Sequence, residues 1–389
     1  MKLLQLCHFL VAAASTVAAF PSDPLRVLQI SDDEVITVRE SQKWELRKEG
    51  VTFFDITKYY NPFKSLLGKG VFNAKEAEVE IEVAKYNYPT EVNHTEVVSE
   101  LIKDIKTENL YRNLAKFTSF HTRYYKSESG FEAAEWLSSQ IHNLTDRLPK
   151  DIMASVRHFD HKEWRQFSII VSIPGSIDPD TIVVIGSHLD CTNFLLPNLL
   201  AAPGADDNGS GTVTNLEALR IIVEYLLKTG KPLRNTIEFH FYSAEEAGLL
   251  GSQDVFSEYR REGKHVVAML QQDMTGYVDD ESLEVIGVIT DYTSTGLTNF
   301  VKLMIDTYLE IPYVETACGY ACSDHASAMK NGFPAAFVIE DDFKRVNKYI
   351  HSTMDTLDRL SFTHMAEYCK LSIGLAIELG EYGNFSEGK

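Results

Sequence analysis

From about residue 165 onward, short runs of β-branched and apolar residues alternate with longer segments of helical periodicity. In 209–227, for example, the apolar residues recur at steps of three and four. Strand–helix alternation is typical of an α/β fold, because successive parallel strands need a long crossover between them. We predict a central mixed, largely parallel β-sheet sandwiched by helices, preceded by a mostly helical stretch. The predicted strands are 168–173, 181–187, 236–242, 266–271 and 283–289, and the predicted helices are 209–227, 295–308, 323–331 and 362–379, with 96–145 mostly helical.

The first 19 residues have the pattern of a secretory signal peptide. Lys2 supplies the positive charge, Leu3 to Val17 form the apolar run, and Val17-Ala18-Ala19 is a small-residue cleavage site. The run is shorter than the roughly 20 residues that span a bilayer. We therefore predict a secreted, extracellular protein with residues 1–19 removed. The expected N-glycosylation sites are Asn93, Asn143 and Asn384.

Residues 20–86 differ from the rest of the chain and end in the charged run Ala74–Lys85. An exposed charged segment tolerates proteolytic cleavage. We predict that 20–86 is a propeptide, acting as inhibitor or folding aid, and that 87–389 is a single domain. The alternative is that 20–86 forms a small N-terminal subdomain of the mature protein.

The acidic composition excludes two classes of partner. The chain has 37 Lys and Arg against 56 Asp and Glu, a formal charge of −19. Nucleic-acid binding needs cationic side chains that displace counterions from phosphates, and an anionic membrane surface also attracts cations. We therefore expect neither nucleic acid nor membrane as a partner. The 44% of hydrophobic residues is enough for a sizeable core.

Histidine and acidic residues follow the predicted strands or precede predicted helices. In an α/β fold such residues meet at the carboxyl edge of the sheet. Imidazole and carboxylate groups are common zinc ligands, and a carboxylate can bind two ions because it has two oxygens. The sequence therefore predicts a metal centre at this edge. The clusters are His188-Leu-Asp190, Asp206-Asp207, Glu245-Glu246, Asp273, and His351 with Asp355.

Six motifs stand in the chain in a fixed order between about residues 88 and 380. Together they resemble the secreted di-zinc leucine aminopeptidases of bacteria and fungi, and the precursor layout is similar to the fungal branch. Each motif alone is weak, but six in order are highly specific. The motifs are His-Leu-Asp, Ala-Pro-Gly-Ala-Asp-Asp, Ala-Glu-Glu-x-Gly-Leu-x-Gly-Ser, Asp-Met-Thr, Cys-Gly-Tyr-Ala-Cys-Ser-Asp-His-Ala and Ile-His-Ser-Thr-x-Asp-Thr.

The resemblance implies the zinc-dependent exopeptidase fold and two Zn²⁺ per chain. Asp207 would bridge the two ions. His188 and Asp273 would complete the ligands of one ion, and Glu246 and His351 those of the other. The chain would act as a monomer on peptides with a free N-terminus.

The resemblance also implies three catalytic roles. Glu245 would be the general base that takes a proton from the zinc-bridging water and passes it to the leaving amine. Asp190 would orient the ring of His188, as metal-bound imidazoles usually require. Tyr320 would stabilise the oxyanion of the tetrahedral intermediate. The peptide bond after Asp207 is often cis in this family.

The cysteines and the expected specificity pocket belong to the same resemblance. Cys318 and Cys322 form a tight pair that a secreted environment would oxidise, and the family also implies this disulfide. Cys191 and Cys369 could be free thiols or a second bridge. The family's pocket for the N-terminal side chain maps to Met274, Ile289, Phe337, Ile339, Phe343 and Ile350, together with Cys318, Tyr320 and Cys322.

We therefore predict a secreted zinc metallo-aminopeptidase that removes N-terminal leucine and other apolar residues. Two alternatives remain: a single-zinc, glutaminyl cyclase-like acyltransferase of the same fold, and a non-enzymatic binding ectodomain that has lost ligands. Among the other histidines, we expect His240 to pack in the core and His325 to be structural. Asp355 is a candidate to orient His351.

Overall fold

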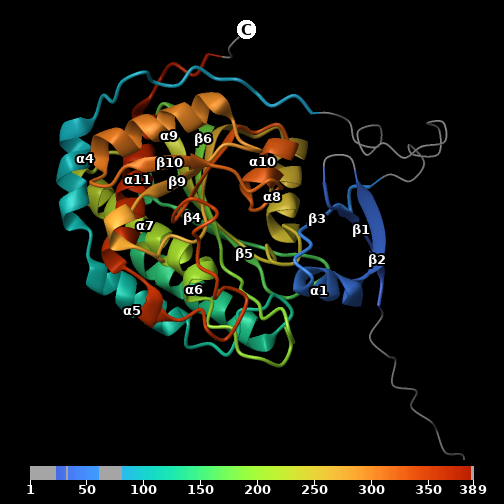
Figure 1. The fold of residues 1–389 in the computed structure, drawn as a ribbon. Helices are drawn as coiled ribbons and strands as arrows, with labels where there is room; N and C mark the ends of the chain where they lie inside the picture. The colour runs from blue at the N-terminus through green and yellow to red at the C-terminus, as the bar shows by residue number, and fades with distance from the viewer. Residues whose placement is uncertain (1–22, 32–33, 61–80, 387–389) are drawn as a thin grey trace, which may run out of the picture.

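The computed structural model describes residues 23–31, 34–60 and 81–386. The predicted signal peptide lies outside these residues, as does most of the charged run before residue 86. In the part of the chain that the structure describes, eight strands form one sheet in the order β10-β9-β11-β8-β6-β7-β5-β4 (Figure 1). The strands are β4 (Ser155–Phe159), β5 (Ser168–Ile173), β6 (Asp178–His188), β7 (Asn235–Tyr242), β8 (His265–Gln272), β9 (Ile286–Ile289), β10 (Tyr313–Thr316) and β11 (Ala335–Ile339).

The centre of this sheet is parallel and its edges are mixed. Strand β6 pairs in parallel with β7 and β8, and β11 pairs in parallel with β8. Strands β4 and β5 add antiparallel pairs at one edge, and β9 runs antiparallel to β11 near the other. The carboxyl ends of the parallel strands β7, β6, β8 and β11 therefore lie side by side at the same end of the sheet.

Helices cover both faces of the sheet. Helices α6, α7, α9 and α11 pack on one face around the largest apolar cluster. Helices α8 and α10 pack on the other face, with Phe256 and Tyr259 against β-strand residues such as Val184 and Met269. The helices are α4 (Thr95–Leu101), α5 (Thr107–Phe117), α6 (Glu128–Thr145), α7 (Gly211–Thr229), α8 (Leu250–Arg261), α9 (Thr295–Tyr308), α10 (His325–Lys330) and α11 (Phe362–Glu381).

The predicted α/β fold with a mixed, largely parallel sheet is confirmed. Each of the five predicted strands is present, although β9 begins three residues later than expected. Four helices or strands of this domain were not predicted: β4, β10, β11 and α8. Strands β10 and β11 are only four and five residues long, so their sequences carry little periodicity.

The N-terminal residues form a small separate sheet beside this domain (Figure 1). Strands β1 (Leu25–Gln29), β2 (Val35–Arg39) and β3 (Phe54–Asp55) pair in the order β2-β1-β3, with helix α1 (Glu40–Lys48) between β2 and β3. The removal of residues 20–86 as a propeptide stays a prediction, because a folded N-terminal segment is compatible with a propeptide and with a retained subdomain.

Several smaller expectations concern the surface and the cysteines. Asn93, Asn143 and Asn384 are exposed, and their glycosylation stays a prediction. Cys191 and Cys369 are buried free thiols.

None of the helices in the described residues combines the length and the apolar character that a membrane-spanning segment needs.

One buried arginine fixes the loop that follows β6. The Arg123 side chain is fully buried and donates hydrogen bonds to the carbonyl oxygens of Leu189 (2.9 Å), Pro203 (2.5 Å) and Gly204 (2.7 Å). A buried carbonyl that loses its donor costs about 1–3 kcal/mol. Arg123 therefore holds both ends of the loop that carries Asp190.

We expect Arg123→Met to lower the free energy of unfolding by at least about 3 kcal/mol, because two buried carbonyl acceptors and one partly buried acceptor lose their donors. Chemical denaturation would measure this loss. Arg112→Met is the matched control, since Arg112 is an exposed arginine on the neighbouring helix α5 and its loss should cost less than about 0.5 kcal/mol. Equal stability of the two variants would contradict this account of the loop.

Candidate metal centre

Three candidate ligands come from the central parallel strands. His188 is the last residue of β6, Glu246 lies in the loop after β7, and Asp273 directly follows β8. Because these strands are neighbours and run in the same direction, their ends place the three side chains together. The other two candidates, Asp207 and His351, come from the turn before α7 and from the loop between β11 and α11.

The structure brings the five predicted ligands into two groups that share one carboxylate. Oδ1 of Asp207 lies 3.2 Å from Nε2 of His188, and Oδ2 of Asp207 lies 2.8 Å from Nε2 of His351. Asp273 Oδ1 is 3.1 Å from the His188 nitrogen, and Glu246 Oε2 is 3.1 Å from the His351 nitrogen. Each group could hold one cation, with Asp207 as the member common to both.

The charges of the groups fit bound divalent cations. Burial raises the pKa of Glu246 to about 7, and the neighbouring Asp207 carboxylate adds to this effect. Burial alone would lower the pKa of His351, but Glu246 and Asp207 raise it to about 10. Glu246 Oε1 is buried without a hydrogen-bond partner among the described residues. Crowded carboxylates, two imidazoles and an unpaired buried oxygen are a donor set that suits zinc.

Asp190 supports both the histidine and the acidic pair. Its backbone oxygen lies 3.2 Å from Nδ1 of His188, and its carboxylate Oδ1 lies 3.5 Å from the same nitrogen. The carboxylate accepts hydrogen bonds from the backbone nitrogens of Glu245 (3.0 Å) and Glu246 (3.4 Å). Asp190 therefore fixes the loop after β7 as well as the imidazole.

Two further residues hold the candidate ligands in place. The Asp355 carboxylate accepts hydrogen bonds from the backbone nitrogens of Asp206 (3.0 Å) and Asp207 (3.1 Å), and so fixes the position of the shared carboxylate. The sequence had instead suggested that Asp355 orients His351. Ser323 Oγ donates to Asp273 Oδ2 at 2.6 Å. Both residues lie inside the six motifs, but a motif does not reveal which backbone or side chain its members meet.

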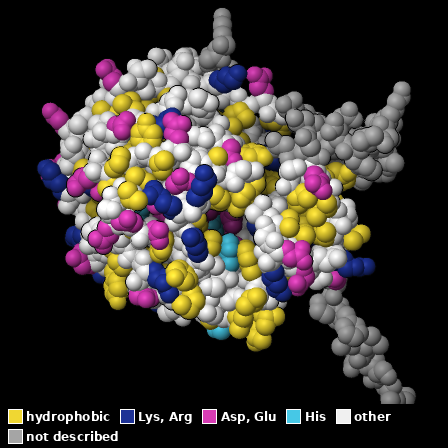
Figure 2. All heavy atoms as spheres, in the orientation of Figure 1, with side chains coloured by type: hydrophobic (Ala, Val, Ile, Leu, Met, Phe, Trp, Pro, Cys, Tyr) yellow, Lys and Arg dark blue, Asp and Glu magenta, His cyan; other side chains and the backbone are white. Residues whose placement is uncertain are grey.

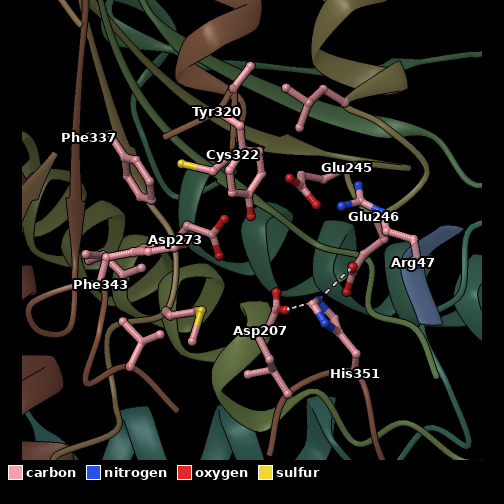
Figure 3. A pocket seen from close by; sticks show the side chains of 16 residues that line it. Arg47, Asp207, Glu245, Glu246, Asp273, Tyr320, Cys322, Phe337, Phe343 and His351 are labelled. Atoms are coloured by element: carbon pink, nitrogen blue, oxygen red, sulfur yellow. Dashed lines mark ion pairs between the residues drawn. The ribbon is translucent and has the colours of Figure 1, made fainter. Parts of the chain in front are cut away.

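The ligand groups open into a cavity (Figure 3), which is open to solvent and has about 620 Å³ of empty space when that solvent is included. Glu245 and Tyr320 line it without belonging to either group. Burial raises the pKa of Glu245 well above its ordinary value and that of Tyr320 to about 12. The Tyr320 hydroxyl points toward the carboxylates in Figure 3. Tyr320 lies between Cys318 and Cys322, whose predicted disulfide is present.

An apolar wall forms one side of the cavity, and most of it was predicted. Ile289 belongs to the same apolar cluster but does not line the cavity. Figure 3 shows Phe337 and Phe343 across the cavity from Glu246 and His351. Cys318 packs against that cluster but likewise does not line the cavity. The predicted pocket residues that line the cavity are Met274, Tyr320, Cys322, Phe337, Ile339, Phe343 and Ile350.

Four residues that line the cavity were not among the predicted site residues: Arg47, Leu249, Ala321 and Val346. Arg47, on helix α1 of the N-terminal segment, reaches the cavity from the side of Glu246 and His351 (Figure 3). No sequence signal connects a basic residue near the N-terminus with a site more than 100 residues later.

The remaining histidines near these motifs lie outside both groups. His240 is buried, with hydrogen-bond contacts to Tyr242 and Glu238 at 2.9 Å each. His325 is buried and stacks against Phe337, with ring centroids 4.7 Å apart. The peptide bond between Asp207 and Asn208 is cis.

Sequence comparisons place this chain among metallopeptidases. Residues 168–375 match the model of peptidase family M28. A probable aminopeptidase of Saccharomyces cerevisiae is 56% identical over 381 residues, covering 97% of this chain and 99% of its own length. Leucine aminopeptidase 1 of Uncinocarpus reesii is 49% identical and covers 91% of this chain and 88% of its own length.

Solved structures agree with the fold. The crystal structure of an aminopeptidase from Legionella pneumophila, LapA, matches with a TM-score of 0.80 and 29% identity, over 93% of this chain and 100% of its own. Residues 87–389 make up less than 93% of the chain, so the part of the chain that matches also includes some of residues 20–86. A glutaminyl cyclase from Porphyromonas gingivalis matches with a TM-score of 0.54 at 17% identity, which shows the common fold alone.

We expect the purified protein to hold about two zinc ions per chain. The variants His188→Ala and His351→Ala should each hold about one zinc ion, and the variant Asp207→Ala should hold close to none. The reason is that each histidine belongs to one group, whereas Asp207 belongs to both. Elemental analysis after dialysis would measure the zinc content. His142→Ala, at an exposed site, should keep the full content. An Asp207→Ala variant that retains both ions would contradict the shared carboxylate.

Proposed function

The chain belongs to peptidase family M28 and is a metallo-aminopeptidase of the leucine aminopeptidase type, and from this premise we propose that it removes leucine and other apolar residues from peptide N-termini with two zinc ions. The observation that carries the proposal is the Asp207 carboxylate, whose two oxygens face two different imidazoles beside an apolar cavity. Secretion after loss of residues 1–19 belongs to the same proposal.

The two zinc ions have distinct protein ligands in this proposal. His188, Asp207 and Asp273 would hold one ion, and Asp207, Glu246 and His351 the other. When bound, such a pair acts as a Lewis acid on the peptide carbonyl and lowers the pKa of a water molecule.

The side chains around the ligands supply the proton transfers. Glu245 would take a proton from the attacking water and deliver it to the leaving amine, because it lines the cavity without belonging to a ligand group. The hydrogen bond from its backbone nitrogen to Asp190 holds it in place. The Tyr320 hydroxyl would donate to the oxygen that becomes negative in the transition state.

The apolar wall supports the preference for the N-terminal residue. Phe337, Ile339 and Phe343 offer contact to a leucine side chain. An acidic side chain would lose its hydration there and find no cation on that wall. The ranking among apolar residues depends on how each side chain fills this space.

The alternatives are less well supported. A cyclase with a single zinc needs one group of ligands, whereas this chain has two groups that share Asp207. A non-enzymatic ectodomain would have lost ligands, whereas all five predicted ligands lie close together.

We expect Glu245→Gln to lower kcat on leucine p-nitroanilide by about 10²–10⁴-fold while the zinc content stays unchanged. The amide keeps the size of the side chain but cannot accept the proton. Glu135→Gln, at an exposed position on α6, is the matched control and should retain full activity. Substantial turnover by Glu245→Gln would rule out its role as the base.

We further propose that the N-terminal segment inhibits the enzyme until it is removed. Lys43 is fully buried, and its Nζ donates to Asp55 Oδ2 and to the Ala247 carbonyl, both at 2.7 Å. Ala247 directly follows the Glu245-Glu246 pair, so the segment is attached beside the proposed base. From this attachment Arg47 extends into the cavity, where a substrate would have to lie.

We expect Arg47→Ala to raise the activity of the uncleaved chain several-fold, chiefly through a lower KM, because the guanidinium leaves space that substrate needs. Initial rates on leucine p-nitroanilide would measure the effect. Lys48→Ala, the exposed neighbour on α1, should change little. If protein that begins at Phe20 is already as active as protein cleaved near residue 87, the segment is not an inhibitor.

A further inference from the structure

The loop between β6 and α7 exposes apolar side chains to solvent. Leu195, Leu196 and Leu199 are 63%, 50% and 67% exposed. The loop has a defined shape, because the backbone nitrogen of Leu195 donates to Asn193 Oδ1 and the Asn193 amide donates to the Ala201 carbonyl, both at 3.0 Å. Figure 2 shows hydrophobic side chains on the same face as the hollow in which histidine is visible. Grouped apolar side chains on a fixed surface loop usually mark a binding surface.

Phe194 connects this loop to the metal centre. Its ring stacks on the His351 ring with centroids 3.8 Å apart, and its backbone nitrogen donates to the His351 carbonyl at 3.1 Å. His351 lies on the side of the cavity opposite Phe337 and Phe343 (Figure 3). A peptide whose first side chain lies on the apolar wall therefore has Phe194 on the opposite side, beyond the ligands.

Side chains of the chain's own N-terminal segment lie in the space between the cavity and Phe194. The Arg47 guanidinium lines the cavity and lies 5.9 Å from the centroid of the Phe194 ring, and the Trp44 ring lies 6.3 Å from it. Peptide side chains can therefore reach from the cavity to Phe194. An extended peptide advances about 3.3–3.6 Å per residue, so the first residues after the scissile bond are long enough to cover this distance.

We propose that Phe194, Leu195, Leu196 and Leu199 form a binding surface for the leaving part of the substrate. This surface, which we call the leucine rim, would select apolar or aromatic side chains at the second and third residues of the peptide. The inference rests on the proposed function, because it assumes that N-terminal residues are cleaved at the metal centre. The occupant is a peptide substrate, since the loop is continuous with the cavity through Phe194 and His351.

The test compares two peptides with the same first residue, Leu-Phe-Leu and Leu-Gly-Gly, and uses leucinamide as a substrate without a leaving side chain. Enzyme purified after expression of the full chain should show a kcat/KM about tenfold higher for Leu-Phe-Leu than for Leu-Gly-Gly, mostly through KM. In the triple variant Leu195→Ser, Leu196→Ser, Leu199→Ser the ratio should fall toward one. Ile177→Ser, an equally exposed apolar residue elsewhere, should keep the tenfold ratio.

The outcomes separate this inference from the proposed function. If leucinamide is hydrolysed but the ratio is already near one, or if the triple variant keeps the ratio, the leucine rim is overturned and the aminopeptidase proposal stands. If none of the three substrates is hydrolysed, both fall. If the triple variant keeps the ratio but changes from dimer to monomer in light scattering, the loop is an interface between copies of the chain and the inference is wrong.

Discussion

The structure of the site depends on one buried carboxylate that faces two imidazoles. The two oxygens of Asp207 point to different histidines, one at the end of β6 and one in the loop before α11. Burying its charge is costly unless other groups compensate it. The carboxylate also needs a rigid surrounding backbone if its two oxygens are to face both imidazoles at once. Asp355 supplies that rigidity through two backbone hydrogen bonds, and Arg123 fixes the adjoining loop.

The same arrangement explains how the two sides of the cavity differ. The apolar wall lies near Asp273, and the opposite side carries Glu246 and His351, with Arg47 beyond them (Figure 3). A peptide that lies across the shared carboxylate would have its first side chain on the apolar wall and its remaining residues toward Phe194. One side of the cavity then selects the residue to be removed, and the other meets the rest of the peptide.

Sequence reasoning predicted the parts of the site that follow from strand direction. The His188, Glu246 and Asp273 positions come from the ends of parallel strands, and such ends meet by topology. The contacts of Asp355, Ser323 and Arg47 could not be predicted, since they join segments far apart in the sequence. A charged lysine is expected at the surface, but Lys43 is buried. Its burial is possible because Asp55 and the Ala247 carbonyl compensate its charge. Strands β10 and β11 are too short to show a period.

The central claim is that two zinc ions share Asp207, and a crystal structure with anomalous scattering at the zinc edge tests it most directly. The account predicts two anomalous peaks roughly 3.5–4 Å apart. One peak should lie beside His188 and Asp273, the other beside Glu246 and His351, with Asp207 between them. A single peak, or two peaks without Asp207 between them, would contradict it.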